Sequence, residues 1–224
     1  DDEYGGSAEN RLRFGLEVIR SVRNAVGPAY PVLYRLSAEG GYGIEEAMSF
    51  AREFEAAGVD ALHVSIGGTA PIGLVPPETS PMAIPQGYLV DYAQTIKDAV
   101  RCPVIVVGEM REPAFAEEVV AQGKADFVAL GRQLLSDPAW ASKAARGLDA
   151  DILRCLSCAH CNRCLSLGTP IRCVVNPRLG RETWLGEPEP AAKPKTVMVV
   201  GSGPAGMEAA RVAALRGHRV SLYE

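Results

Sequence analysis

Five of the six cysteines lie within nineteen residues, and this cluster constrains the fold more than any other feature of the chain. They are Cys155, Cys158, Cys161, Cys164 and Cys173, while Cys102 is distant in the sequence. A small secreted scaffold spreads its cysteines through the whole domain as disulfides. A tight group inside an otherwise ordinary chain indicates a metal site instead. Because the chain opens with Asp1-Asp2-Glu3 and no signal peptide, we expect this site in a reducing cytoplasm.

The spacing of these cysteines is typical of an iron–sulfur cluster. Cys155, Cys158 and Cys161 are each separated by two residues, and Cys173 follows after eleven more. Three closely spaced thiolates can bind one side of a cubane while a distant fourth closes it. A zinc ribbon needs a real spacer between its two C-x-x-C pairs, and only two residues separate the pairs here. We predict an iron–sulfur ligand set of Cys155, Cys158, Cys161 and Cys173. A structural zinc module linking two domains, and a set in which Cys164 replaces Cys155, stay as alternatives.

The composition is that of a folded protein of one or two domains. The chain has 224 residues, of which 47% are hydrophobic and 22% charged, and this excludes an intrinsically disordered chain. A formal net charge of −4 gives no reason to expect nucleic acid or an anionic membrane as a partner. No apolar run approaches the roughly 18 residues that span a bilayer.

Residues 1–148 alternate predicted strands and helices. The strands are expected at 31–37, 60–66, 103–107 and 126–130, and the helices at 9–26, 44–57, 88–100, 113–122 and 138–146. The strands are apolar on both faces, which favours an α/β fold with a parallel sheet covered by helices. Four such units are half of a (β/α)8 barrel, but part of an open doubly wound sheet has the same pattern. The loop over 67–87, with its five prolines, is long enough to indicate a function.

Glycines follow the last two strands of this region. Gly108 ends one strand, and Gly131-Arg132 ends the next. In a β/α barrel these loops commonly bind a phosphate through backbone N–H groups, and an arginine adds charge. Glycine also ends strands that bind nothing. Arg35 is a charge inside an apolar strand and needs either a ligand or an acidic partner, whereas His63 on the next strand is expected to be a satisfied core histidine.

Residues 196–224 carry a dinucleotide-binding fingerprint. A strand leads into Gly-Ser-Gly-Pro-Ala-Gly, a helix follows, and a second strand ends in an acid. Gly201 makes the tight turn, Gly203 admits a pyrophosphate to the helix N-terminus, and Gly206 permits close helix–strand packing. Glu224 can bind ribose hydroxyls. One βαβ unit cannot bury its apolar faces alone, and the chain opens with a helix that has no strand before it, so we expect the chain to be a fragment of a longer protein, cut at both ends.

Together these motifs resemble the old yellow enzyme family, in the iron–sulfur flavoprotein branch that includes 2,4-dienoyl-CoA reductase, enoate reductase and trimethylamine dehydrogenase. The segments that carry the resemblance are 2–11 (DEYGGSAENR), 35–37, 123–132, 137–138 and 171–177. The resemblance implies four parts. They are the C-terminal half of an FMN-binding TIM barrel (1–148), a [4Fe-4S] segment (149–185), a linker (186–195) and the start of a Rossmann-like FAD- and NAD(P)-binding domain (196–224).

The resemblance also implies a role for each candidate residue. Arg35 would contact the pyrimidine edge of FMN and stabilise the reduced flavin, and the four predicted cysteine ligands would hold the [4Fe-4S] cluster. The FMN phosphate would be held by Gly108, Gly131 and Arg132. The ADP half of FAD would be held by Gly201, Gly203, Gly206 and Glu224.

The implied activity is an oxidoreductase reaction on a small molecule. Electrons would pass from NAD(P)H through FAD and the cluster to FMN, which would reduce an activated C=C bond. An amine dehydrogenase of the trimethylamine dehydrogenase type would send them the opposite way. The intact protein could form a homo-oligomer.

Three departures from the family pattern bear on the site. The family's catalytic tyrosine would lie upstream of Asp1. Thr69 stands about where dienoyl-CoA reductases carry a histidine. The sequence therefore does not support dienoyl-CoA as the substrate. Glu109 follows Gly108, and we expect its side chain to point away, because an unpaired carboxylate would be repelled by a phosphate.

Overall fold

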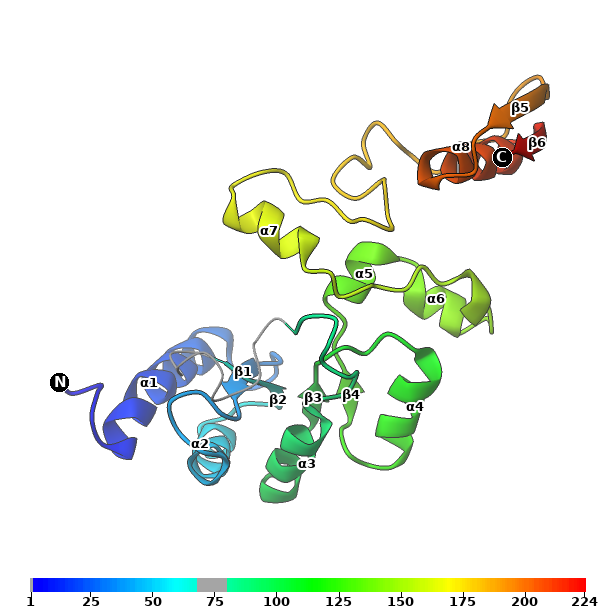
Figure 1. Ribbon diagram of the computed structural model, residues 1–224. Coiled ribbons are helices and arrows are strands. Elements are labelled where there is room, and N and C mark those ends of the chain that lie inside the picture. The colour runs from blue at the N-terminus through cyan, green and yellow to red at the C-terminus, as the bar shows by residue number, and fades with distance from the viewer. Residues whose placement is uncertain (1, 68–79) are drawn as a thin grey trace. The chain divides into compact units, whose positions relative to one another are not determined.

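The computed structural model describes residues 2–67 and 80–224 and divides the chain into two compact units (Figure 1). The first runs to Asn176 and contains the cysteines, and the second runs from Pro177 to Glu224. The predicted cluster segment 149–185 thus falls partly in each unit. None of the helices in the described ranges is both long and apolar enough to cross a membrane.

The first unit is built on a four-stranded parallel sheet. Its strands, in spatial order, are β1 (Leu33–Ser37), β2 (Ala61–Ser65), β3 (Val104–Val106) and β4 (Phe127–Val128). Their order in space is their order in sequence. A doubly wound sheet reverses its strand order at a switch point, whereas consecutive order throughout is the arrangement of a β/α barrel. The predicted parallel α/β sheet is therefore confirmed, and its strand order favours the barrel.

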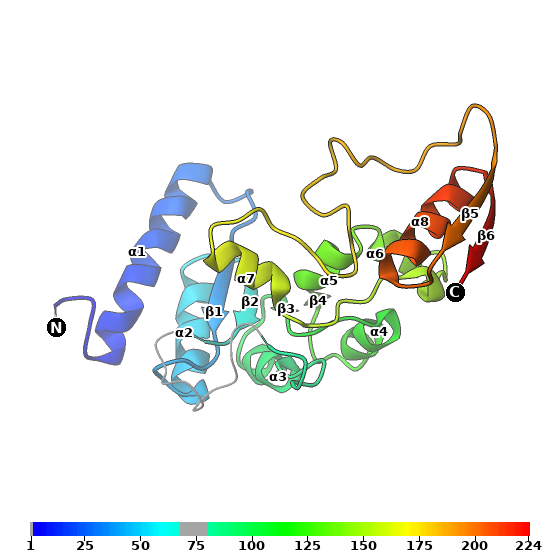
Figure 2. The same ribbon diagram turned by 45° about the horizontal axis from the view of Figure 1, so that its top comes forward.

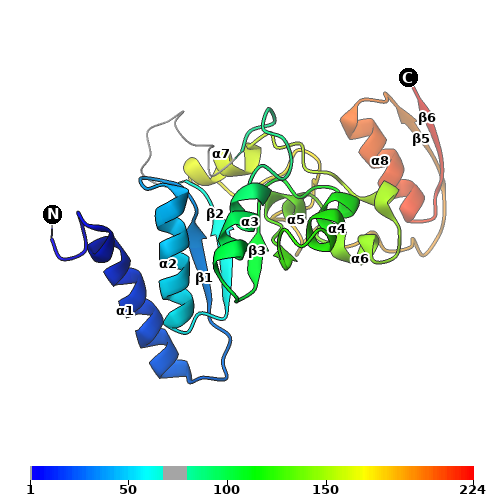
Figure 3. The same ribbon diagram turned by 90° about the horizontal axis from the view of Figure 1, so that it is seen from below.

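Helices cover one face of this sheet. They are α2 (Ile44–Ala56), α3 (Val90–Ala99) and α4 (Pro113–Ala121), which stand in a row in Figure 3. The opening helix α1 (Ala8–Val26) packs against α2 and is N-capped by Ser7, whose hydroxyl accepts the Asn10 N–H at 3.2 Å. Such a cap satisfies one of the free N–H groups at a helix start.

The two faces of the sheet differ because side chains alternate along each strand. The row Leu36, Val64 and Val106 crosses the sheet in register and is buried with the helices in the main core. The opposite face carries the row Arg35, His63, Ile105 and Phe127, in which Arg35 is exposed and Phe127 is 56% exposed. Arg35 therefore stands on the open face of the sheet.

After β4 the chain forms short helices that the sequence patterns only partly predict. They are α5 (Arg132–Ser136), α6 (Trp140–Ala144), the 3-10 turn η1 (Asp149–Asp151) and α7 (His160–Ser166). Trp140 packs with Ala116 and Ile152 in a small second core, and its Nε1 donates to the Arg111 carbonyl at 2.9 Å. Figure 1 shows α7 apart from the sheet, Figure 2 shows it in front of β1 and β2, and Figure 3 places it on the side where these two strands end.

The second unit holds one βαβ motif, as predicted. Strands β5 (Thr196–Val200) and β6 (Arg219–Tyr223) pair in parallel, and α8 (Pro204–Leu215) connects them. Pro204 begins the helix, where its missing N–H costs nothing.

Candidate flavin and cysteine sites

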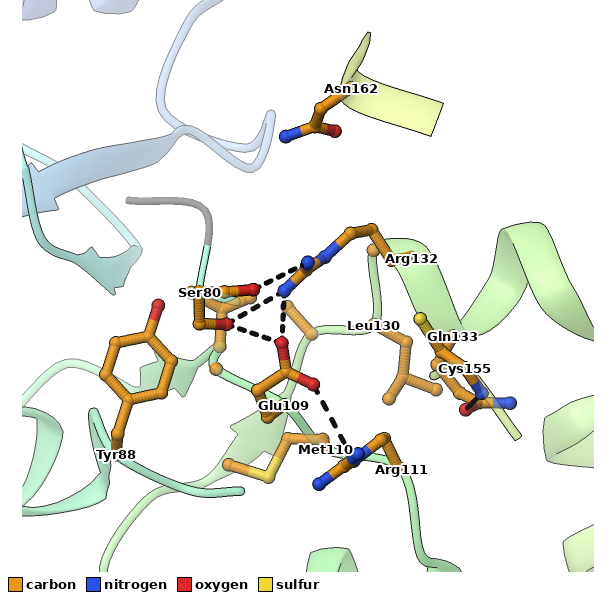
Figure 4. Close-up of a pocket in the computed structure, with 14 residues that line it drawn as sticks. Ser80, Tyr88, Glu109, Met110, Arg111, Leu130, Arg132, Gln133, Cys155 and Asn162 are labelled. Carbon is orange, nitrogen blue, oxygen red and sulfur yellow. Dashed lines mark hydrogen bonds and ion pairs between the residues drawn. The ribbon is translucent and has the colours of Figure 1, made fainter. Parts of the chain in front are cut away.

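A pocket of about 190 Å³ lies where β3 and β4 end, and we call it the anion pocket (Figure 4). It is lined by Ser80, Tyr88, Val107–Arg111, Ala129–Gln133, Cys155 and Asn162. Gly108 has φ +126°, a conformation that favours glycine. A Cβ there would also lie 3.2 Å from the side chains of Tyr88 and Leu89. The structure thus brings Gly108, Gly131 and Arg132 together, and their role as phosphate ligands stays a prediction.

Glu109 corrects the prediction for its side chain, which points into the pocket and is only 3% exposed. One carboxylate oxygen accepts hydrogen bonds from Arg132 Nη2 and Ser80 Oγ. The other accepts from Ser157 Oγ and lies 3.6 Å from Arg111 Nε. The prediction was wrong because it took the carboxylate as unpaired, whereas a buried charge is tolerated when opposite charges and donors surround it.

Arg132 binds Ser80 at the wall of the pocket. Its Nη1 donates to the Ser80 carbonyl at 2.7 Å and its Nη2 to the Ser80 hydroxyl at 2.8 Å. Figure 4 shows Arg132 and Arg111 approaching Glu109 from two sides. Two guanidinium groups and one carboxylate give the pocket a net charge of +1, which suits an anionic ligand. Sequence reasoning missed Ser80 and Arg111, although Arg111 stands only three residues after Gly108.

Two polar residues of the open sheet face lie side by side. Arg35 and His63 are partners in the β1–β2 register. His63 Nε2 is buried and has no hydrogen-bond partner among the residues the structure describes, so the expectation of a satisfied core histidine was wrong. Burial, and secondarily the charge of Arg35, lowers the pKa of His63. Thr69 lies outside the described residues.

The cysteines form a second site next to the anion pocket. Cys155, Cys158, Cys161 and Cys173 line one small cavity, of about 20 Å³, together with Arg132 and Leu135. Cys164 does not line it, and its Sγ lies 3.8 Å from His160 Nε2. Within residues 2–67 and 80–224, no three His, Cys, Asp or Glu side chains are arranged to hold a metal ion. The four thiols nevertheless are the donor type that iron–sulfur clusters use.

Helix α5 and the residue after it hold the backbone that leads into the cysteines. Gln133 donates to the Leu153 carbonyl and accepts the Cys155 N–H, each at 3.0 Å. Asp137 accepts the Leu153 N–H at 2.9 Å. The Leu135 carbonyl accepts from Asn176 Nδ2 at 2.9 Å, so both ends of the cysteine region are bound to the same short helix. Burial raises the pKa of the Cys161 thiol, and Arg132 is among the groups that oppose this.

The predicted dinucleotide residues gather at one turn of the second unit. Gly201 has φ +101°, and a Cβ on Gly206 would lie 1.9 Å from the Gly201 carbonyl oxygen, so this turn requires both glycines. Gly203 caps α8. Glu224 accepts from the N–H and the hydroxyl of Ser202 at 2.5 Å each, and these bonds lower the pKa of Glu224.

Comparison with known proteins identifies the family. The model of the NADH:flavin oxidoreductase / NADH oxidase family matches residues 1–151. An NADH oxidase of Thermoanaerobacter brockii is 47% identical over 231 residues, which cover 100% of this chain and 35% of that protein. A solved 2-naphthoyl-CoA reductase complex superposes with a TM-score of 0.91 at 35% identity, covering 99% of this chain and 34% of that one.

Histamine dehydrogenase from Rhizobium sp. 4-9 is also similar, with a TM-score of 0.86 at 31% identity over 99% of this chain and 33% of that one. The chain thus spans about one third of the length of these relatives. The predicted resemblance to old yellow enzyme-type proteins is confirmed. The chain belongs to the NADH:flavin oxidoreductase / NADH oxidase family, a family of flavin-dependent enzymes.

Proposed function

We propose that the intact protein uses FMN, FAD and a [4Fe-4S] cluster to reduce an activated C=C bond of a small molecule with NAD(P)H. The observation that carries this proposal is the adjacency of the two sites, because Arg132 and Cys155 line both the anion pocket and the cysteine cavity. A flavin phosphate and a cluster bound there would be neighbours. The similarity to a 2-naphthoyl-CoA reductase supports the direction of reduction.

The anion pocket would hold the FMN phosphate. Its backbone N–H groups at Gly108 and Gly131 and its guanidinium groups at Arg111 and Arg132 are donors for phosphate oxygens. Arg35, on the open face of β1, would meet the pyrimidine edge of the flavin and stabilise negative charge there. FMN, once bound, supplies hydride transfer, while the protein supplies position and electrostatics.

Cys155, Cys158, Cys161 and Cys173 would hold the cluster, which supplies single-electron transfer. Gln133 fixes the backbone of the first of these ligands, and Ser157 donates its N–H to Cys155 Sγ at 3.4 Å. In the second unit, Gly203 would admit the FAD pyrophosphate to the start of α8, and Glu224 would accept ribose hydroxyls. The Glu224 carboxylate lies at this turn and accepts hydrogen bonds from Ser202.

The test is cofactor and turnover analysis of the full-length parent protein, purified without oxygen. We expect FMN and FAD in equal amounts, iron and acid-labile sulfide in equal amounts, and NAD(P)H oxidation that depends on an α,β-unsaturated acid or thioester. Zinc without iron would establish the structural zinc module instead. Amine oxidation without alkene reduction would establish the amine dehydrogenase alternative. The similarity to histamine dehydrogenase is the observation that favours this alternative.

A further inference from the structure

Glu109 holds an unusual position between the two sites of the first unit. It follows β3 with φ +56°, in the left-handed region that residues with a Cβ rarely adopt. Such a conformation persists where the surrounding contacts determine it, and it is enriched at functional sites. The contacts here are charged and buried, because Glu109 is only 3% exposed between Arg132 and Arg111.

The two oxygens of the Glu109 carboxylate contact different sites. Oε1 accepts from Arg132 and Ser80, both in the anion pocket. Oε2 accepts from Ser157, a residue between Cys155 and Cys158 that lies 48 positions further along the chain. One side chain therefore binds the pocket wall and the cysteine loop at the same time.

Ser157 transmits this contact to the cysteines. It is buried, adopts φ +52°, and donates its N–H to Cys155 Sγ at 3.4 Å. Its hydroxyl has a charged acceptor in Glu109, and hydrogen bonds to charged groups are stronger than neutral ones. Moving the Glu109 carboxylate would therefore move the loop from which Cys155 and Cys158 project.

We propose that Glu109 is a positioning residue that couples the anion pocket to the cysteine site, an inference that rests on the proposed function. A phosphate that engages Arg132 fixes the guanidinium that holds Glu109, and Glu109 in turn fixes Ser157. Occupancy of either site then stabilises ligand binding at the other, and this coupling is reciprocal because it is a free energy shared by both sites.

The experiment measures how fast an iron chelator removes the cluster from the full-length parent, with FMN bound and after FMN has been removed. The visible absorbance of the cluster reports its loss, and no turnover is needed. In the wild type, bound FMN should slow the loss by about tenfold, within the usual range of coupling between sites. Glu109→Gln loses the negative charge that contacts both Arg132 and Ser157. In this variant the rate of cluster loss without FMN, divided by the rate with FMN, should fall toward one.

The ratio of the rates of cluster loss without and with FMN distinguishes coupling from a general structural effect. If Glu109 only supported the fold, Glu109→Gln would accelerate cluster loss in both forms and leave the ratio unchanged, which would overturn the inference. Glu112→Gln is the matched control. Glu112 also reaches the cysteine region, through Arg154 Nε at 2.6 Å, but this pair is exposed and lies outside the anion pocket. The ratio for Glu112→Gln should equal that of the wild type. An equal fall of the ratio in Glu109→Gln and Glu112→Gln would overturn the inference too.

Ser157→Ala provides a second variant if Glu109→Gln does not fold. It removes only the hydroxyl on the cysteine side of the contact and should lower the ratio in the same way; an unchanged ratio there would overturn the inference. A parent protein without a cluster would overturn the proposed function as well. A protein that holds FMN and the cluster but keeps its ratio in both variants would overturn only the coupling.

Discussion

Lys143 Nζ lies 2.6 Å from the Asp137 carboxylate, and this ion pair fixes the chain just before the first predicted cluster ligand. The Asp137 side chain is 3% exposed, and the same oxygen that meets Lys143 also accepts the Leu153 N–H. Lys143 donates further to the Asp151 carbonyl at 2.8 Å. The backbone of residues 151–153 is therefore set by one buried carboxylate and one lysine.

Replacing Asp137 by alanine should destabilise the folded protein by about 3 kcal/mol, the usual cost of leaving one member of a buried pair alone. Urea denaturation of the full-length parent would measure this change in the free energy of unfolding. Glu112→Ala breaks the exposed pair with Arg154 and should change stability by less than about 1 kcal/mol. Equal effects of the two variants would contradict the assignment of Asp137 as the anchor.

Cys173→Ala should abolish the cluster, whereas Cys164→Ala should retain it. Cys173 lines the cysteine cavity, while Cys164 lies outside that lining and contacts His160 instead. Iron and sulfide content of the two purified variants would check this. Comparable iron loss from both would show that Cys164 belongs to the ligand set.

Arg132→Ala should weaken FMN retention by roughly ten- to a hundredfold, because a charge-assisted contact is worth about 1.5–3 kcal/mol. Arg132→Ala also removes one of the two guanidinium groups next to the buried Glu109 carboxylate. Among the described residues, Arg111 is then the one guanidinium within 4 Å of it. Arg132→Lys should rescue binding only in part, since lysine lacks the planar fork. Flavin content after gel filtration measures both effects, and full FMN occupancy in Arg132→Ala would show that the phosphate lies elsewhere.

Alanine substitutions at two glycines of the dinucleotide turn should have different effects. Gly206→Ala would place a Cβ 1.9 Å from the Gly201 carbonyl and should distort the turn whether or not FAD is present. At Gly203 a Cβ meets nothing within 4 Å, so Gly203→Ala should fold normally and obstruct only the approach of the pyrophosphate. Thermal unfolding with and without FAD separates the two. A normal melting temperature for FAD-free Gly206→Ala would refute the steric argument.

His63 should make stability depend on pH. Burial lowers its pKa in the folded state, so the unfolded chain binds a proton first as the pH falls. Stability should therefore decrease as the pH drops below about 6.5, the ordinary histidine value. His63→Leu should remove this contribution, and chemical denaturation across that range would show whether the slope disappears.

The fold follows from local patterns to a large extent, because β1, β2 and the helix α2 between them have clear apolar periodicity. The patterns miss α5 and α7, since helices of five and seven residues depend on tertiary contacts such as those of buried Gln133. The Glu109 side chain could not be placed from the sequence, because its partner Ser157 is 48 residues away. Gly108 and Gly131 line one pocket because each follows a strand of the same sheet edge, and the four predicted cysteine ligands line one cavity. The roles of these residues as ligands stay predictions.

Helix α5 has a consequence for recombining parts of such proteins. It presents Arg132 to the anion pocket, while Gln133 and Leu135 bind the two ends of the cysteine region. A chimera joined anywhere between the sheet and the cysteines would pair an α5 from one homologue with a loop adapted to another. A junction placed after Asn176, where the first compact unit ends, would keep these partners together. The sheet, α5 and the cysteines should therefore be exchanged together as one piece.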